Sequence, residues 1–121
     1  MRKILVVDDE HDICEFVRNF LQERGYEVLM ASNGDDALAI VKKERPELIL
    51  LDIKMQGMDG IAVLKHIKDI DRKFKVVMVT AVEDQEKVDE ACRLGACEYI
   101  TKPLVLDHLE QVVEKNLGEN T

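Results

Sequence analysis

Acidic, hydroxyl and basic side chains follow four short apolar runs of the sequence, each close to the point where a run ends. They are Asp8, Asp9 and Glu10 after residues 4–7, Asp52 after residues 48–51, Thr80 after residues 76–79, and Lys102 after residues 97–100. Carboxylates that adjoin apolar segments lose hydration and repel one another, so a nearby cation must compensate them. Hard carboxylate oxygens at few positions favour Mg²⁺, which binds one or two carboxylates and retains several waters.

The same side chains are suited to phosphoryl transfer. An aspartate beside Mg²⁺ is a weak nucleophile that accepts a phosphoryl group in aspartyl-phosphate enzymes. Asp52 is the expected acceptor, because its run is expected to form a central strand between the acidic pair and Thr80. Lys102 and the metal would neutralise charge on the phosphoryl oxygens, and the Thr80 hydroxyl would donate a hydrogen bond to one of them. His11, a lone histidine after the acids, is expected to be solvated.

These side chains must be positioned by short strands that alternate with helices. The runs at residues 4–7, 48–51 and 76–79 are typical of strands buried on both faces. Residues 28–30 alternate with polar neighbours, which favours an edge strand, and residues 97–100 form a weaker run. The pattern predicts an α/β domain of (βα)5 order, with a doubly wound parallel sheet and right-handed crossovers. In such a sheet ligands bind outside the carboxyl ends of the strands, where the polar side chains fall.

Helical periodicity and end signals support the segments between the strands. Apolar positions at i, i+3 and i+4 predict that one face of the first helix is buried, through Ile13, Phe16, Val17, Phe20 and Leu21. Gly25 is expected to end this helix in the left-handed conformation. Asn33 and Asp59 are expected as N-caps of later helices.

The composition predicts a single domain over residues 1–121. Hydrophobic residues make up 46% and charged residues 35% of the chain, which excludes disorder by composition. The net charge of −8 argues against binding of nucleic acid or an anionic membrane through this domain, since both are negative. No signal-peptide pattern and no membrane-length apolar run is present, so we expect a cytoplasmic protein. Three cysteines without CxxC spacing are expected as small core residues: Cys14, Cys92 and Cys97.

Five dispersed motifs that span the whole chain resemble the receiver domain of two-component response regulators. In order they are ILVVDDE, GYEV with ASNGDDAL, LILLDIKMQGMDG, VVMVTA and LGACEYITKPL. The resemblance implies a flavodoxin-like, five-stranded parallel sheet with strand order 2-1-3-4-5. It also implies reversible, Mg²⁺-dependent phosphorylation of Asp52 by a histidine kinase or a histidine phosphotransfer protein.

Matching positions carry the family's metal and phosphoryl ligands onto this chain. By this correspondence Asp8, Asp9 and Asp52 would hold Mg²⁺ together with the backbone carbonyl of Lys54. Lys102 would contact the phosphoryl group.

Other matching positions concern the response to phosphorylation. Thr80 would be the switch hydroxyl, and Tyr99 would be the aromatic side chain that turns inward on activation. The Lys102–Pro103 peptide bond would be cis, an unusual geometry that the family resemblance alone implies. Gln56 stands where this family commonly has proline, which frees φ in the loop that supplies the Lys54 carbonyl.

The segments KERPELILLDIK and GMDGIAVLKHIK look most like single-domain receivers of sporulation-type phosphorelays, and enhancer-binding regulators share much of the pattern. We expect a phosphoacceptor rather than an enzyme, which takes part in its own phosphorylation and dephosphorylation. It would act as a monomer or weak dimer on a downstream protein target. Two alternatives stay open. The chain could be the receiver fragment of a larger DNA-binding response regulator, or a haloacid-dehalogenase-like phosphatase with Asp8 as nucleophile.

The resemblance further implies that two flanking residues set the lifetime of the phosphoryl group. Lys54 and Val82 lie two residues after Asp52 and Thr80, at positions that tune hydrolysis in this family. Hydrolysis needs a water in line behind the phosphorus, and Val82 has no polar atom to orient one. The Lys54 ammonium would cover the same approach. We therefore expect a long-lived aspartyl phosphate, which suits a relay.

Overall fold

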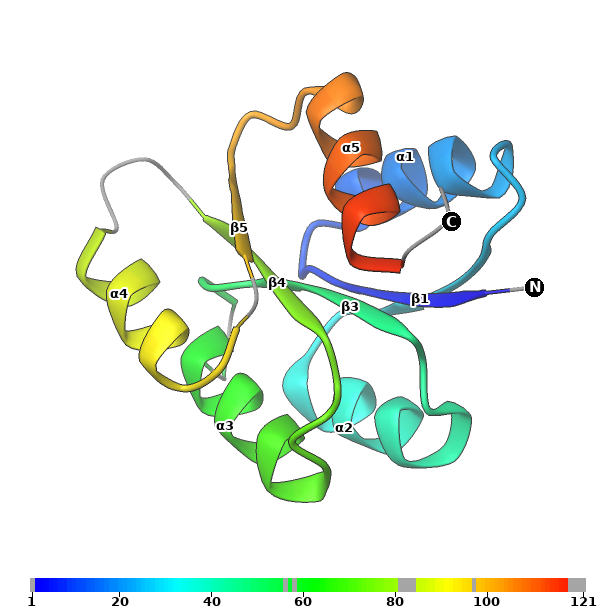
Figure 1. Cartoon of the computed structure of the whole chain (residues 1–121). Coiled ribbons are helices and arrows are strands. Elements are labelled where there is room, and N and C mark those ends of the chain that lie inside the picture. The colour runs from blue at the N-terminus through cyan, green and yellow to red at the C-terminus, as the bar shows by residue number, and fades with distance from the viewer. Residues whose placement is uncertain (1, 56, 58, 81–84, 97, 118–121) are drawn as a thin grey trace.

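The computed structural model describes residues 2–55, 57, 59–80, 85–96 and 98–117. Along these residues strands and helices alternate (Figure 1). In chain order they are β1 (Lys3–Val7), α1 (His11–Gln22), β2 (Glu27–Ala31), α2 (Gly34–Glu44), β3 (Leu48–Asp52), α3 (Gly60–Ile70), β4 (Val76–Thr80), α4 (Gln85–Arg93), β5 (Glu98–Thr101) and α5 (Leu106–Leu117). The predicted (βα)5 order is confirmed.

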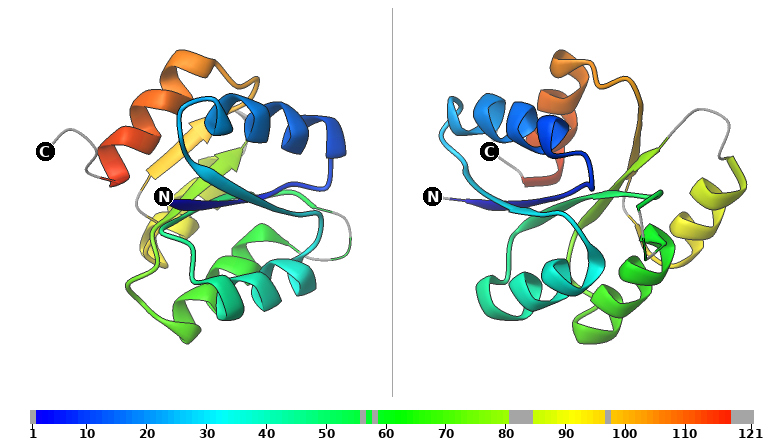
Figure 2. Two further views of the ribbon diagram at one scale, coloured as in Figure 1. Left: turned by 90° about the vertical axis from the view of Figure 1, so that its right-hand side faces the viewer. Right: turned by 180° about the vertical axis from the view of Figure 1, so that it is seen from behind.

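The strands form one parallel sheet in the order β2-β1-β3-β4-β5, as predicted. Helices α1 and α5 cover one face, and α2, α3 and α4 cover the other (Figures 1 and 2). The strand with polar alternation, β2, is an edge strand and is only partly buried. Because all strands are parallel, their carboxyl ends meet at one edge of the sheet.

The two faces of the sheet carry separate apolar cores. Successive residues of a strand point to opposite faces, so Ile49 packs toward α2 and α3 while Leu50 packs toward α1 and α5. β3 and β4 are buried at every residue, which is why their sequences are continuous apolar runs. Because β3 and β4 are buried, their last residues, Asp52 and Thr80, are held in place at the carboxyl edge of the sheet.

Two side chains that were expected in the core are exposed instead. The prediction for Phe16 is wrong, because it is 51% exposed while Cys14 takes its place in the buried stripe of α1. A helix turns about 100° per residue, which sets Phe16 roughly 110° from the middle of that stripe. The prediction for Cys92 is also wrong, because α4 buries only a narrow stripe formed by Val88 and Ala91.

The prediction that the cysteines are core residues is confirmed for Cys14 and wrong for Cys92. Cys14 is buried and its thiol donates to the Asp8 carbonyl at 3.2 Å. Burial, with the nearby charge of Asp8, raises the pKa of the Cys14 thiol to about 11, so the thiol is neutral at physiological pH. Cys97 lies outside the described residues.

The expected helix ends are confirmed. The Asn33 side chain accepts from the Asp36 N–H and the Asp59 side chain accepts from the Ile61 N–H, so both are N-caps. Gly25 follows α1 with φ of +91°, a conformation that favours glycine. Among the described residues, no helix has both the length and the apolar character needed to cross a bilayer.

Candidate functional site

The polar side chains predicted from the ends of the apolar runs meet at the carboxyl edge of the sheet. Asp8 and Asp9 follow β1, Asp52 and Thr80 are the last residues of β3 and β4, and Lys102 follows β5. One carboxylate oxygen from each of the three aspartates lies within 4.8 Å of the other two. Asp8, Asp52 and Thr80 are 3%, 4% and 2% exposed. Residues 44 positions apart in the chain thus share one largely desolvated cluster.

Backbone hydrogen bonds fix the side chains of this cluster. The Glu10 N–H donates to Asp8 Oδ1 at 2.9 Å, and the Lys54 N–H donates to Asp52 Oδ1 at 3.2 Å. The Lys102 N–H donates to the Thr80 carbonyl at 2.7 Å, which joins the loop after β5 to the end of β4. The Lys102–Pro103 bond is cis, as the resemblance implied.

Lys102 supplies the cation inside the cluster. Its Nζ lies 3.2 Å from Asp52 Oδ2, where it donates a hydrogen bond, and 3.4 Å from Asp8 Oδ2. Glu10 reaches the same ammonium, with Oε1 at 3.6 Å, from a more exposed position at the rim. Sequence reasoning grouped Glu10 with the acids but gave it no role. Its contact with Lys102 depends on the path of the loop after β5.

The protonation equilibria reflect burial and repulsion. Burial, followed by the negative charge of Asp8, raises the pKa of Asp52 to about 6, although Lys102 opposes the shift. Burial alone would lower the pKa of Lys102, but the carboxylates of Asp52 and Asp8 outweigh it and raise that pKa. The negative charge of the carboxylates at this site therefore exceeds the positive charge of its one lysine.

The donor set fits a hard divalent cation. Three carboxylates converge, with hard oxygen atoms only, and no cysteine or histidine joins this cluster in the described part of the chain. A cation among them would counter both the burial and the Asp8 repulsion that raise the pKa of Asp52.

A cleft adjoins the acidic cluster on the side of the β3–α3 loop. It has a volume of about 640 Å³, and its lining includes Asp9, Lys54 and Lys87. Lys54 is exposed, and its backbone N–H already holds Asp52. Val82 and Gln56, which the sequence singled out for phosphoryl lifetime and loop rigidity, lie outside the described residues.

Thr80 and Tyr99 differ in how they face the cluster. Thr80 is buried at the end of β4, beside Asp52 in the parallel register, where Val79 pairs with Asp52. Tyr99 lies on β5 and is 41% exposed, so a large part of its side chain faces solvent. The neighbouring strands β4 and β5 pair at Met78 and Tyr99 and again at Thr80 and Thr101.

Gly60 is a structural residue of the site that sequence reasoning missed. It begins α3, and its N–H donates to the Ile53 carbonyl at 2.7 Å. A Cβ on Gly60 would lie 2.1 Å from the Asp52 carbonyl oxygen and 2.7 Å from Ile53 Cα. The Asp59-Gly60 pair just before a helical pattern was the available signal, but the close approach depends on how α3 packs.

The arrangement suits phosphoryl transfer to a carboxylate. The Oδ2 atom of the Asp52 carboxylate contacts Lys102. Asp8 and Asp9 lie where they could bind a cation, which would neutralise charge on the phosphoryl oxygens. The buried hydroxyl of Thr80 adds a hydrogen-bond donor on the neighbouring strand.

Two curated relatives are similar over almost all of this chain. Sporulation initiation phosphotransferase F of Bacillus subtilis (strain 168) is 42% identical over 115 residues, which cover 95% of this chain and 93% of that protein. The transcriptional regulatory protein ZraR of Salmonella typhimurium (strain LT2) is 41% identical over 115 residues, which cover 95% of this chain and 26% of ZraR. The chain therefore spans nearly all of one relative and about a quarter of the other.

A solved structure and a family model also match almost the whole chain. The response regulator receiver domain protein from Clostridium thermocellum superposes with a TM-score of 0.93 at 30% identity, covering 99% of this chain and 97% of that one. The family described as response regulator receiver domain matches residues 4–114, a range that contains all the polar residues of the cluster. This chain belongs to the response regulator receiver domain family.

Proposed function

We propose that Asp52 of this receiver domain accepts a phosphoryl group from a histidine kinase or a histidine phosphotransfer protein. The observation that carries the proposal is the buried Asp52 carboxylate, whose Oδ2 lies 3.2 Å from the Lys102 ammonium beside two further acids. Receiver domains act in two-component signal transduction, which supports a phosphoryl acceptor at this site.

In this proposal an Asp52 oxygen attacks the phosphorus of a phosphohistidine. The new P–O bond forms as the P–N bond breaks, and the electron pair of that bond leaves with the imidazole. Lys102 stays against the phosphoryl oxygens, and Thr80 donates its hydroxyl to one of them. Asp8, Asp9, Asp52 and the Lys54 carbonyl would hold Mg²⁺, which would supply charge neutralisation. Incubation with acetyl phosphate and Mg²⁺ tests the proposal, because the intact protein should gain one phosphoryl group.

A relay role is the form of this function that we favour. The similarity to sporulation initiation phosphotransferase F extends along 93% of that protein, at slightly higher identity than the similarity to ZraR. We propose a single receiver domain over residues 1–121, a monomer or weak dimer in the cytoplasm. It would act as a phosphoacceptor rather than an enzyme and would signal to a downstream protein.

The two alternatives are less favoured. A receiver fragment of a DNA-binding regulator would share the same site, and the similarity to ZraR covers that part of ZraR alone. A phosphatase that uses Asp8 is disfavoured because residues 4–114 match the response regulator receiver domain family.

Metal binding should stabilise the fold. A saturating cation stabilises a protein by RT ln(1 + [L]/Kd), about 2.7 kcal/mol at a concentration one hundred times the Kd. We expect millimolar Mg²⁺ to raise the melting temperature of the wild type and to have little effect on Asp9→Asn. Asp107→Asn, the same charge change at an exposed position of α5, serves as the control and should respond like the wild type. An unchanged wild-type melt would contradict Mg²⁺ binding here.

We also propose a long-lived aspartyl phosphate, with Lys54 and Val82 limiting attack by water. Lys54 lines the cleft next to Asp9, two residues after the acceptor. Lys54→Asn would replace an ammonium that covers the approach with an amide that can orient a water, so the phosphoryl group should decay several-fold faster. Decay of phosphorylated protein measures this, with Lys43→Asn on α2 as the control. A decay rate equal to or slower than that of the wild type would refute the role of Lys54.

We propose that Thr80 and Tyr99 couple phosphorylation of Asp52 to a conformational change. One new hydrogen bond from Thr80 to a phosphoryl oxygen would shift the population modestly toward a state with Tyr99 turned inward, since a ligand shifts an equilibrium only by its differential affinity. NMR shift changes on phosphorylation are expected to cluster at residues 80–110, a range that includes α4, β5 and the start of α5. Confinement of the changes to the acidic loops would argue against this switch, and Thr80→Ala should confine them in this way.

A further inference from the structure

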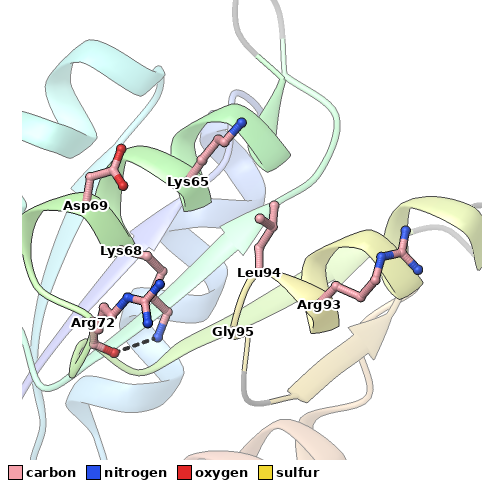
Figure 3. Close-up of a pocket in the computed structure, with 7 residues that line it drawn as sticks. All are labelled: Lys65, Lys68, Asp69, Arg72, Arg93, Leu94 and Gly95. Carbon is pink, nitrogen blue, oxygen red and sulfur yellow. Dashed lines mark hydrogen bonds between the residues drawn. The ribbon is translucent and has the colours of Figure 1, made fainter.

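A basic cleft lies between α3 and α4, on the opposite side of the molecule from the acidic cluster. The helices run back against the parallel strands, so the C-terminal ends of α3 and α4 lie toward the amino edge of the sheet (Figure 1). The cleft has a volume of about 450 Å³ and is shown in Figure 3. Its lining consists of Lys65, Lys68, Asp69, Arg72, Arg93, Leu94 and Gly95. Four cations and one acid thus share one concave surface of a chain whose net charge is −8.

One of these cations is already engaged within the fold. The Lys68 ammonium donates to the backbone carbonyls of Arg72 and Phe74, which closes the turn after α3. Gly95 lies against the Lys68 side chain, since a Cβ there would come within 3.3 Å of Lys68 Cε. Lys68 therefore contributes fixed positive charge to the floor of the cleft.

The other three cations are exposed to solvent and are not paired with a carboxylate of the described residues. Lys65, Arg72 and Arg93 are exposed, and within the described residues none of them forms an ion pair. Several other surface cations do pair with acids, as Arg45 does with Asp71 and Lys87 does with Asp59. The helix dipole accounts for a cation in the last turn of a helix, which describes Arg93. It does not account for Lys65, which lies mid-helix, or for Arg72, which lies beyond the end of α3.

The lining favours charge recognition over stacking. No aromatic side chain lines the cleft among the described residues, and Leu94 is its one large apolar side chain. In Figure 3, Lys68 and Arg72 lie together on the α3 side, while Arg93 extends from α4 on the far side of Leu94. Closing on a ligand therefore requires rotation of the exposed Arg93 side chain. A guanidinium binds phosphate through two parallel hydrogen bonds, a geometry that a carboxylate shares but at lower charge.

We propose that this cleft binds a compact oligophosphate, a chain of two or three phosphoryl groups. Its volume falls in the range of small-molecule sites, and its excess of three positive charges matches such an anion. The ligand would bridge Arg72 on the α3 side to Arg93 on the α4 side. It would be a free oligophosphate or the phosphate chain of a nucleotide, and it would bind independently of phosphorylation at Asp52.

Titration of the full chain with sodium tripolyphosphate, followed by amide NMR shifts in metal-free buffer, tests the proposal. Shift changes are expected to centre on residues 65–72 and 93–95 and to saturate below millimolar concentration. The double variant Arg72→Gln with Arg93→Gln should bind at least tenfold more weakly, because two charge-assisted contacts are lost. Lys42→Gln with Lys43→Gln, which removes two exposed positive charges from α2, should bind within about twofold of the wild type.

Two comparison ligands show which kind of phosphate compound the cleft binds and whether it prefers phosphate. Adenosine triphosphate binding as tightly as tripolyphosphate would assign the site to nucleotide phosphate chains, and weaker binding would assign it to free oligophosphate. Equal binding of citrate would overturn the preference for phosphate. Shifts spread over the chain, or equal affinity of the folded double variant, would overturn the site. Both arginines are exposed, so the double variant should keep its fold. Circular dichroism of the variant checks this.

Discussion

Replacement of Asp52 by asparagine should abolish phosphorylation and at the same time stabilise the metal-free protein. The amide cannot accept the phosphoryl group, so incorporation should fall by more than about a hundredfold. The same change removes a buried charge that Asp8 repels, while Lys102 keeps its contacts with Asp8 and Glu10. At pH 7 the gain in unfolding free energy should be about 1–3 kcal/mol, measured by urea denaturation in chelated buffer.

The stability gain should depend on pH in a defined direction. The pKa of Asp52 is about 6 in the folded chain against 3.8 as its ordinary value, so the folded state holds the extra proton between these values. Wild-type stability must then fall, relative to Asp52→Asn, as the pH rises from about 4 to about 6. Below pH 4 the two proteins should converge. Asp107→Asn, at an exposed position, should show no such pH-dependent difference, and a constant offset for Asp52→Asn would contradict the account.

Gly60→Ala should be the most destabilising single methyl addition at the site. The new Cβ would lie 2.1 Å from the Asp52 carbonyl oxygen and 2.9 Å from that of Ile53, and both are backbone atoms of a buried segment. Relief requires α3 to move away from β3, with loss of the Gly60 hydrogen bond to Ile53. We expect a loss of about 3 kcal/mol or more in unfolding free energy, measured by urea denaturation.

Gly25→Ala separates the steric effect from glycine's conformational freedom. Gly25 has φ of +91°, but no atom lies within 4 Å of a Cβ at that position. Its substitution should cost about 1 kcal/mol through backbone strain alone. A Gly60→Ala variant no less stable than Gly25→Ala would contradict the close approach of α3 to Asp52.

The sequence predicted the sheet and its polar edge because both depend on local patterns. Continuous apolar runs mark strands covered on two faces, and in a parallel sheet the residues after those runs must converge. Asp8, Asp52, Thr80 and Lys102 were found in this way, from the residues alone. The cis peptide at Lys102–Pro103 was reached only through the family resemblance, since most peptide bonds before proline are trans.

Features that depend on how elements pack were missed or wrong. Periodicity identified an apolar face of α1 but not its centre, so Phe16 was placed in the core and is exposed. The steric role of Gly60 arises only when α3 approaches β3. The basic cleft joins Arg72 and Arg93, which are far apart in sequence and meet only through the packing of α3 against α4. No local pattern contains these distances.

The identity of the phosphorylated residue tests the central claim most directly. After incubation with acetyl phosphate and Mg²⁺, the acyl phosphate can be reduced with borohydride and the modified position located by peptide mass spectrometry. We expect modification at Asp52 alone, absent without Mg²⁺ and absent in Asp52→Asn. Modification of Asp8, or undiminished labelling of Asp52→Asn, would contradict the central claim.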